Sequence, residues 1–162
     1  MNIELMILIG SIAFTVLILP LLIKRDRLLD ALISFSVMQA MTWLFGALVV
    51  EERLIEYPAD FFNFATRTSF TFEYFIFPAV GAIFNVHYPR GSSRFVQALY
   101  ILGIPGAITA AEVLIEHYTK IIDYVDWKWE YSFLSMTATL LLSYGYYRWF
   151  IGRIRRSRLP EV

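Results

Sequence analysis

The segment LMILIGSIAFTVLILPLLI, residues 5–23, carries no charged side chain, and neither does ALISFSVMQAMTWLFGALVV, residues 31–50. An α-helix rises about 1.5 Å per residue, so roughly 20 apolar residues cross the hydrocarbon core of a bilayer, which is about 30 Å thick. The basic sequence KRDR, residues 24–27, lies between the two segments. The sequence therefore predicts two membrane-spanning helices joined by a short turn.

Three further segments of similar length, residues 69–89, 95–115 and 131–151, complete the predicted set. The 162-residue chain is 58% hydrophobic and 17% charged, against roughly 45–50% and about 25% in soluble domains. A chain of this length buries only about 70% of its surface on folding, so the surplus apolar surface must face lipid. We expect one all-α domain, residues 1–162, built as an integral membrane bundle of five transmembrane helices.

Lysine and arginine are unequally distributed between the two ends of this predicted bundle. Ten of them lie in the first and third connections, at the end of the last span or after it, and four lie in the second and fourth connections. Because cationic loops remain in the cytoplasm, the bias predicts an N-terminus outside and a C-terminus inside. Glu4 stands where a signal peptide would carry basic residues, so the first segment is expected to stay as an anchor.

Two predicted outer loops carry aromatic side chains. Residues 58–68 alternate Phe61, Phe62 and Phe64 with polar residues, which favours a short interfacial helix or a re-entrant turn. Residues 117–130 combine isoleucine, tyrosine and tryptophan with charged residues. We expect both loops to lie at the membrane interface.

Glu73 and Glu112 are the acidic residues inside predicted spans. An ionisable group there is costly, so it normally faces the bundle and has a partner. Both lie about one helical turn below the outer surface, and Thr109 extends the polar face of the helix that carries Glu112. The two carboxyls could share a proton, bind a cation or act as an acid–base pair. Alternatively, each is tied to a basic residue such as Arg67 and only holds the bundle together.

Four further polar residues are expected to form hydrogen bonds between helices. Gln39 and Trp43 recur at helical spacing in the middle of the second span. Asp30 and Asn85 lie near the cytoplasmic end, where Asp30 could also be a helix N-cap or a partner of Arg27. Structural hydrogen bonding is the simplest interpretation of all four.

Several kinds of site are not indicated. The chain has no cysteine and two histidines, which fall at opposite ends of the predicted bundle, so neither a metal site nor a cofactor is expected. Equal numbers of basic and acidic residues argue against a nucleic-acid partner. Pro78 and Pro105 each remove a backbone donor, which predicts kinks that free the carbonyls of Tyr74 and Ile101.

The run SFTFEYF, residues 69–75, is followed by Pro78, by FN at residues 84–85 and by YP at residues 88–89. This pattern resembles the central signature of an uncharacterised family of small five-span membrane proteins from endospore-forming Gram-positive bacteria. The resemblance implies a multi-pass protein of the bacterial plasma membrane or spore membrane, and it implies no activity.

Three classes of function agree with this sequence. Short inner loops and the lack of a catalytic motif favour a non-enzymatic accessory or assembly protein, with a role in sporulation as one form of it. Its partners would be membrane lipid and either a second copy or another membrane protein. The alternatives are a small oligomeric transporter or channel with an outer carboxylate pocket, and an intramembrane enzyme that acts on lipid.

Overall fold

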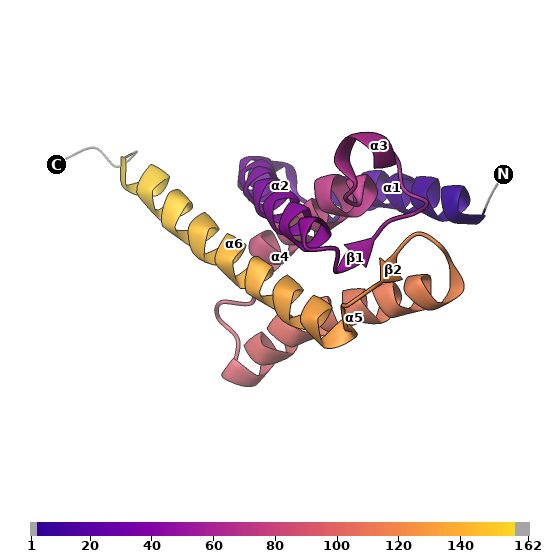
Figure 1. The fold of residues 1–162 in the computed structure, drawn as a ribbon. Coiled ribbons are helices and arrows are strands. Elements are labelled where there is room, and N and C mark those ends of the chain that lie inside the picture. Colours follow the sequence, from indigo (N-terminus) through magenta and orange to yellow (C-terminus); the bar gives the residue numbers. More distant parts are fainter. Residues whose placement is uncertain (1–2, 158–162) are drawn as a thin grey trace.

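The computed structural model describes residues 3–157, apart from the side chains of residues 63–64 and 155–157. The prediction of a helical fold is confirmed (Figure 1). Five helices dominate, and the shorter elements are a 3₁₀ turn, one short helix, a π-helical turn and two short strands. The main helices are α1 (Ile3–Leu22), α2 (Leu28–Glu51), α4 (Phe77–His87), α5 (Arg94–Tyr118) and α6 (Trp129–Ser157). The shorter elements are η1 (Arg25–Arg27), β1 (Ile55–Glu56), α3 (Asn63–Thr66), η2 (Phe72–Ile76) and β2 (Asp123–Tyr124).

Three helical segments are long and apolar enough to cross a membrane: Ile3–Leu22, Arg25–Glu51 and Arg94–Tyr118. They match three of the five expected spans. The α4 helix is too short by itself, because it has 11 residues and follows the π-helical turn η2. The α6 helix has 29 residues, but tyrosine, serine, threonine and arginine lower its hydropathy.

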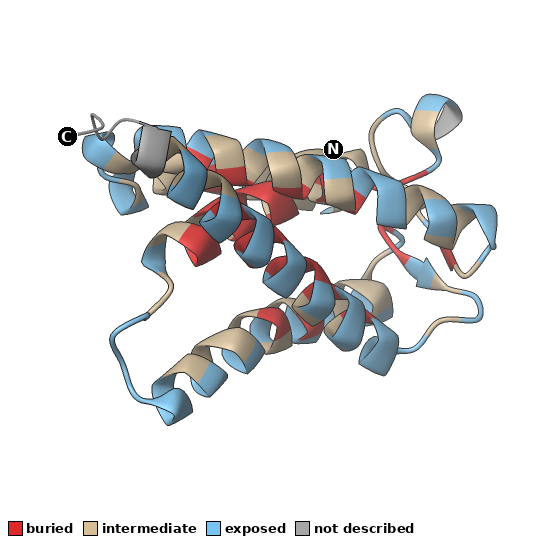
Figure 2. Ribbon diagram, turned by 90° about the vertical axis from the view of Figure 1, so that its left-hand side faces the viewer, coloured by how far each residue is buried: buried red, intermediate tan, exposed pale blue. Residues whose placement is uncertain are grey.

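The core lies where α2, α4 and α6 meet. Figure 2 shows buried positions along the inner faces of the helices and exposed positions along their outer faces. The helix α5 packs on α6, whereas α1 packs on α4 and η2. The buried side chains of this core are Met38, Phe77, Phe84, Met136, Leu140, Tyr144 and Tyr147.

Small residues let α2 and α4 approach closely. The buried face of α2 follows helical spacing through Ala31, Ser34, Met38 and Thr42. Gly81 of α4 lies directly against Met38, because a Cβ added at Gly81 would be 2.5 Å from Met38 Cγ. Close contact through small residues is the usual way in which membrane helices pack, since lipid offers no hydrophobic driving force.

A π-helical turn precedes Pro78. Side chains of α2 donate hydrogen bonds to the backbone carbonyls that are left free there. The N–H of Phe77 bonds to the carbonyl of Phe72, and Pro78 has no N–H to donate. Thr42 Oγ1 donates to the Glu73 carbonyl at 2.6 Å, and Gln39 Nε2 donates to the Tyr74 carbonyl at 3.1 Å. The helix distortion expected at Pro78 therefore takes the form of a π turn. At the second proline, α5 continues as an α-helix, so the kink expected there stays a prediction.

We expect Thr42→Val to destabilise the protein by about 1–3 kcal/mol, because it leaves the buried Glu73 carbonyl without its donor. Thermal unfolding in detergent measures this effect. The matched control is Thr137→Val, since Thr137 donates only to the Phe133 carbonyl within its own helix. Equal melting temperatures for the two variants would contradict the role given to Thr42.

The two loops that we predicted to be outer loops pair with each other at one end of the bundle. Strand β1 pairs antiparallel with β2, with Ile55 opposite Tyr124. In the second loop Ile121 and Ile122 are buried against the protein, although we expected this loop at the membrane surface. In the first loop the helix α3 spans four residues. Asp60 joins this loop to the helix that follows, because its carboxylate accepts hydrogen bonds from Ser69 Oγ and Thr71 Oγ1.

Candidate functional site

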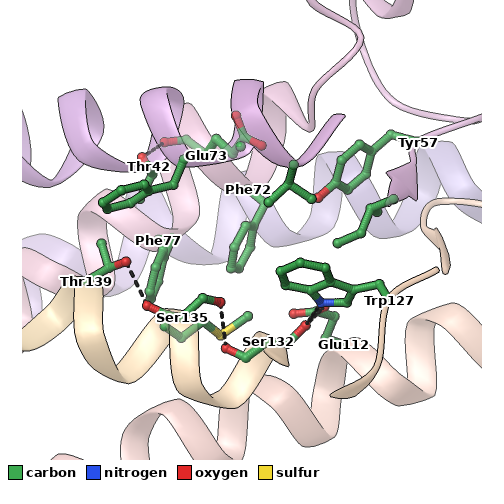
Figure 3. A pocket seen from close by; sticks show the side chains of 15 residues that line it. Thr42, Tyr57, Phe72, Glu73, Phe77, Glu112, Trp127, Ser132, Ser135 and Thr139 are labelled. Atoms are coloured by element: carbon green, nitrogen blue, oxygen red, sulfur yellow. Dashed lines mark hydrogen bonds between the residues drawn. The ribbon is translucent and has the colours of Figure 1, made fainter. Parts of the chain in front are cut away.

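Glu73 and Glu112 line the same small cavity, which we call the carboxyl chamber. Its volume is about 90 Å³, and its walls come from α2, the β1 loop, η2, α5 and the start of α6. Figure 3 shows Glu73 beside Thr42 on the α2 side and Glu112 beside Trp127 and Ser132 on the α6 side. The rings of Phe72 and Trp127 lie between the two carboxyl groups, and Tyr57 enters from the side with its hydroxyl toward the middle. The other lining residues are Phe45, Gly46, Val49, Ile55, Phe77, Ser135, Met136 and Thr139.

The Glu73 side chain is only 4% exposed. Its Oε2 atom has no hydrogen-bond partner within residues 3–157. Gly46 is required for its position, because a Cβ at residue 46 would overlap the carboxyl group. A buried carboxyl oxygen without a donor is costly in an apolar setting. Thr68 and the Ser69 backbone lie beside the Glu73 carboxyl group, so the unused hydrogen-bonding capacity is that of Oε2.

Glu112 is instead held by hydroxyl groups from the outer loop and α6. Tyr124 donates from its hydroxyl to Glu112 Oε1, and Ser132 Oγ donates to the same atom at 2.7 Å. Trp127 Nε1 donates to Ser132 Oγ at 2.8 Å. This network fixes the Glu112 carboxylate and connects α5, the outer loop and α6.

Tyr57, which lines the chamber, and Tyr124, which donates a hydrogen bond to Glu112, both have acidic surroundings. Burial raises the pKa of Tyr57 well above its ordinary value, and the nearby carboxylates of Glu73 and Glu112 raise it further. Burial also raises the pKa of Tyr124, with Glu112 as the next cause. Both phenols therefore remain neutral hydrogen-bonding groups at physiological pH.

Arg67 and Thr109 do not form part of the chamber. Arg67 lines a separate outer pocket with Arg53 and Glu56. In the described part of the chain the ion pair found is Arg27 with Asp30, so no ion pair joins Arg67 to either glutamate there. Arg67 has a positive φ of 55°, and this turn leaves it exposed. Thr109 is buried, and its hydroxyl lies 3.9 Å from Met136 Sδ in the contact between α5 and α6.

The four expected interhelical polar residues all have hydrogen-bond partners in another segment. Gln39 bonds to η2, as described above. Asn85 Nδ2 donates to Ser143 Oγ at 3.0 Å in the buried contact between α4 and α6. Asp30 pairs with Arg27 at 3.2 Å and accepts a hydrogen bond from the Tyr147 hydroxyl at 3.0 Å. Trp43 is 50% exposed on the outer face of α2, and its side chain is a hydrogen-bond partner of Tyr74 in η2.

An apolar cavity adjoins the chamber, and we call it the lateral groove. Its volume is about 400 Å³, and α1, η2, α5 and the outer loop form its walls. Tyr57, Phe72 and Glu112 line both cavities. Most of its remaining lining is apolar: Ile76, Ala107, Ile108, Ala111, Ile115, Ile121 and Ile122, with Ser11 and Ser69 as polar members.

Sequence reasoning missed Tyr57, Tyr124, Trp127 and Ser132 as site residues. They lie in loops or at the start of a helix, where no periodicity indicates which way a side chain points. Tyr57 and Tyr124 come together through the pairing of β1 with β2, which joins segments far apart in the chain. The aromatic content of the loops was the only available signal, and it predicted a membrane surface.

These features define a mostly helical protein with three helices able to cross a membrane and a small acidic chamber at one end. Across the described residues there is no cluster of three or more metal-ligating side chains. Comparisons with protein-family models, curated proteins and solved structures find no match to this chain.

Proposed function

We propose that this chain is a multi-pass protein of the bacterial plasma membrane with five spans, an external N-terminus and a cytoplasmic C-terminus. We further propose that it is a non-enzymatic accessory protein, which binds an amphiphilic lipid in the lateral groove. The observation that carries the second proposal is the groove itself, an apolar cavity of about 400 Å³ with Glu112 and Tyr57 in its lining.

The packing of α1 and α5 explains why a groove is present. Because α5 rests on α6 while α1 rests on α4 and η2, η2 forms the floor between two helices that pack on different partners. Both α1 and α5 are long and apolar enough to cross a membrane. In the proposed orientation a lipid chain would enter from the outer leaflet and replace bilayer contacts with contacts to isoleucine and alanine. Burial of apolar chain and fixed polar groups together are typical of ligand sites.

The proposed orientation is supported by the placement of the loops. Figure 1 shows the β1–β2 ribbon at one end and the loop between α4 and α5 at the other. Near that second end Arg27 Nη2 donates to the Val86 carbonyl, and Arg90 Nε donates to the Tyr144 hydroxyl. The positive-inside rule assigns this cationic end to the cytoplasm.

Single-cysteine labelling tests the orientation cleanly, because the chain contains no cysteine. Asp126 and Ser92 are both exposed, in loops at opposite ends. We expect Asp126→Cys to react with a membrane-impermeant maleimide on intact cells, and Ser92→Cys to react only after permeabilisation. The reverse pattern would invert the proposed topology.

A variant with a filled lateral groove tests whether lipid binds there. Ala111 lines the groove, whereas its neighbour Ala110 is also exposed but does not line it. We expect Ala111→Trp to lose the co-purifying lipid that native mass spectrometry detects on the parent protein, because indole fills the groove. Ala110→Trp should retain it. Equal lipid content in the two variants, or none on the parent protein, would contradict the proposal.

A further inference from the structure

We infer that the carboxyl chamber binds a primary ammonium group, carried by an amphiphile whose apolar chain occupies the lateral groove. This inference rests on the proposed function and adds the chemistry of the ligand's head. Its basis is the set of side chains that meet in the chamber. Two carboxyl groups line it, and none of its lining residues is a lysine, arginine or histidine.

The aromatic lining also favours a cation. Phe45, Tyr57, Phe72, Phe77 and Trp127 contribute to the chamber walls. The face of an aromatic ring attracts a cation, and the attraction is stronger in a site from which water is excluded. Carboxylates and rings together therefore select positive charge and disfavour anionic groups.

The free oxygen of Glu73 distinguishes a primary ammonium from a quaternary one. Glu73 Oε2 is buried and lacks a donor among the described residues. A primary ammonium carries three N–H donors, whereas a quaternary ammonium carries none. An ammonium in the chamber would satisfy this acceptor, and its positive charge would favour the ionised form of the carboxyl group. The Glu112 carboxyl group, held by Tyr124 and Ser132, is already in place as the second acidic wall.

The size of the carboxyl chamber and its connection to the lateral groove fit a single ligand that occupies both. The chamber volume of about 90 Å³ corresponds to roughly three water molecules at about 30 Å³ each, which suits a small head group. Because Tyr57, Phe72 and Glu112 line both cavities, one molecule can place its head in the chamber and its chain in the groove. The lining of neither cavity contains a basic residue that could pair with a phosphate. We therefore expect the ligand to be a long-chain amine without a phosphate group.

The test compares ligands with the same chain on the full-length protein in nanodiscs, with empty nanodiscs as the blank. The probes are dodecylamine, dodecyltrimethylammonium, dodecanol and dodecyl sulfate at pH 7, measured by isothermal titration calorimetry. We expect dodecylamine to bind at least about tenfold more tightly than each of the others, as a charge-assisted hydrogen bond implies. Glu73→Gln and Glu112→Gln should each weaken dodecylamine binding by about tenfold and leave dodecanol binding unchanged.

The matched control is Glu130→Gln, an exposed glutamate at the start of α6, which should bind all probes as the parent does. Equal binding of dodecanol and dodecylamine would overturn the ammonium inference while leaving the groove proposal intact. Failure of every probe to bind would overturn the proposed function and the inference with it. Lysophosphatidylethanolamine is titrated as a fifth probe, and tighter binding of it than of dodecylamine would overturn the assignment of a phosphate-free amine.

Discussion

Gly81→Leu is expected to abolish the folded bundle or to lower its stability by about 3 kcal/mol or more. A Cβ at residue 81 would lie 2.5 Å from Met38 Cγ and 3.1 Å from Met38 Cβ. Met38 is fully buried in the core between α2, α4 and α6, so it has no free space to move into. A leucine would therefore force α2 and α4 apart. Circular dichroism during thermal unfolding in detergent measures the loss.

Gly103→Leu is the control for this substitution, because a Cβ at Gly103 meets nothing within 4 Å. Leucine has a higher helix propensity than glycine, so the control should unfold at the parent temperature or slightly above it. The account of the α2–α4 contact fails if Gly81→Leu melts together with the control. Gly81→Ala should fall between the two, since alanine adds the clashing Cβ alone.

Asp60→Ala is expected to have the second large effect, a loss of about 2–4 kcal/mol. The Asp60 carboxylate accepts hydrogen bonds from Ser69 Oγ, from Thr71 Oγ1 at 3.0 Å and from the Phe61 backbone N–H at 2.6 Å. Hydrogen bonds to a charged group contribute about 1.5–3 kcal/mol each, and they are not additive within one network. Ser69 and Thr71 are buried, so their hydroxyls would be left without this partner.

The same substitution should loosen the outer loop that carries Tyr57 into the chamber. Hydrogen exchange of the 57–72 backbone should therefore increase in Asp60→Ala. Asp126→Ala is the control, because Asp126 is exposed in the other outer loop. It should change neither the melting temperature nor the exchange of residues 57–72. A stability loss without faster exchange in this segment would show that Asp60 does not anchor the loop.

The helical fold could be predicted from the sequence because its cause is local. Uncharged runs such as residues 5–23 have few alternatives to a helix once they meet lipid, where the backbone must satisfy its own hydrogen bonds. Pro78 could likewise be recognised as a site of freed backbone carbonyls. The donors to these carbonyls could not be predicted, because Thr42 and Gln39 come from another helix and reach η2 only through tertiary packing.

The candidate site could likewise be predicted only in part. Composition and hydropathy by themselves predicted helical positions for Glu73 and Glu112, and the structure places them in η2 and α5. The similar depth that helical rise predicts for them stays a prediction. Composition and hydropathy offered Arg67 as a partner of these carboxyls only as an alternative, because the direction of a side chain after a turn depends on backbone angles that no residue pattern specifies. Only the tertiary structure decided that both glutamates line one chamber with Tyr57 and Trp127. The physical reason is that the rotation of each helix about its axis, and the pairing of β1 with β2, follow from contacts between segments distant in sequence.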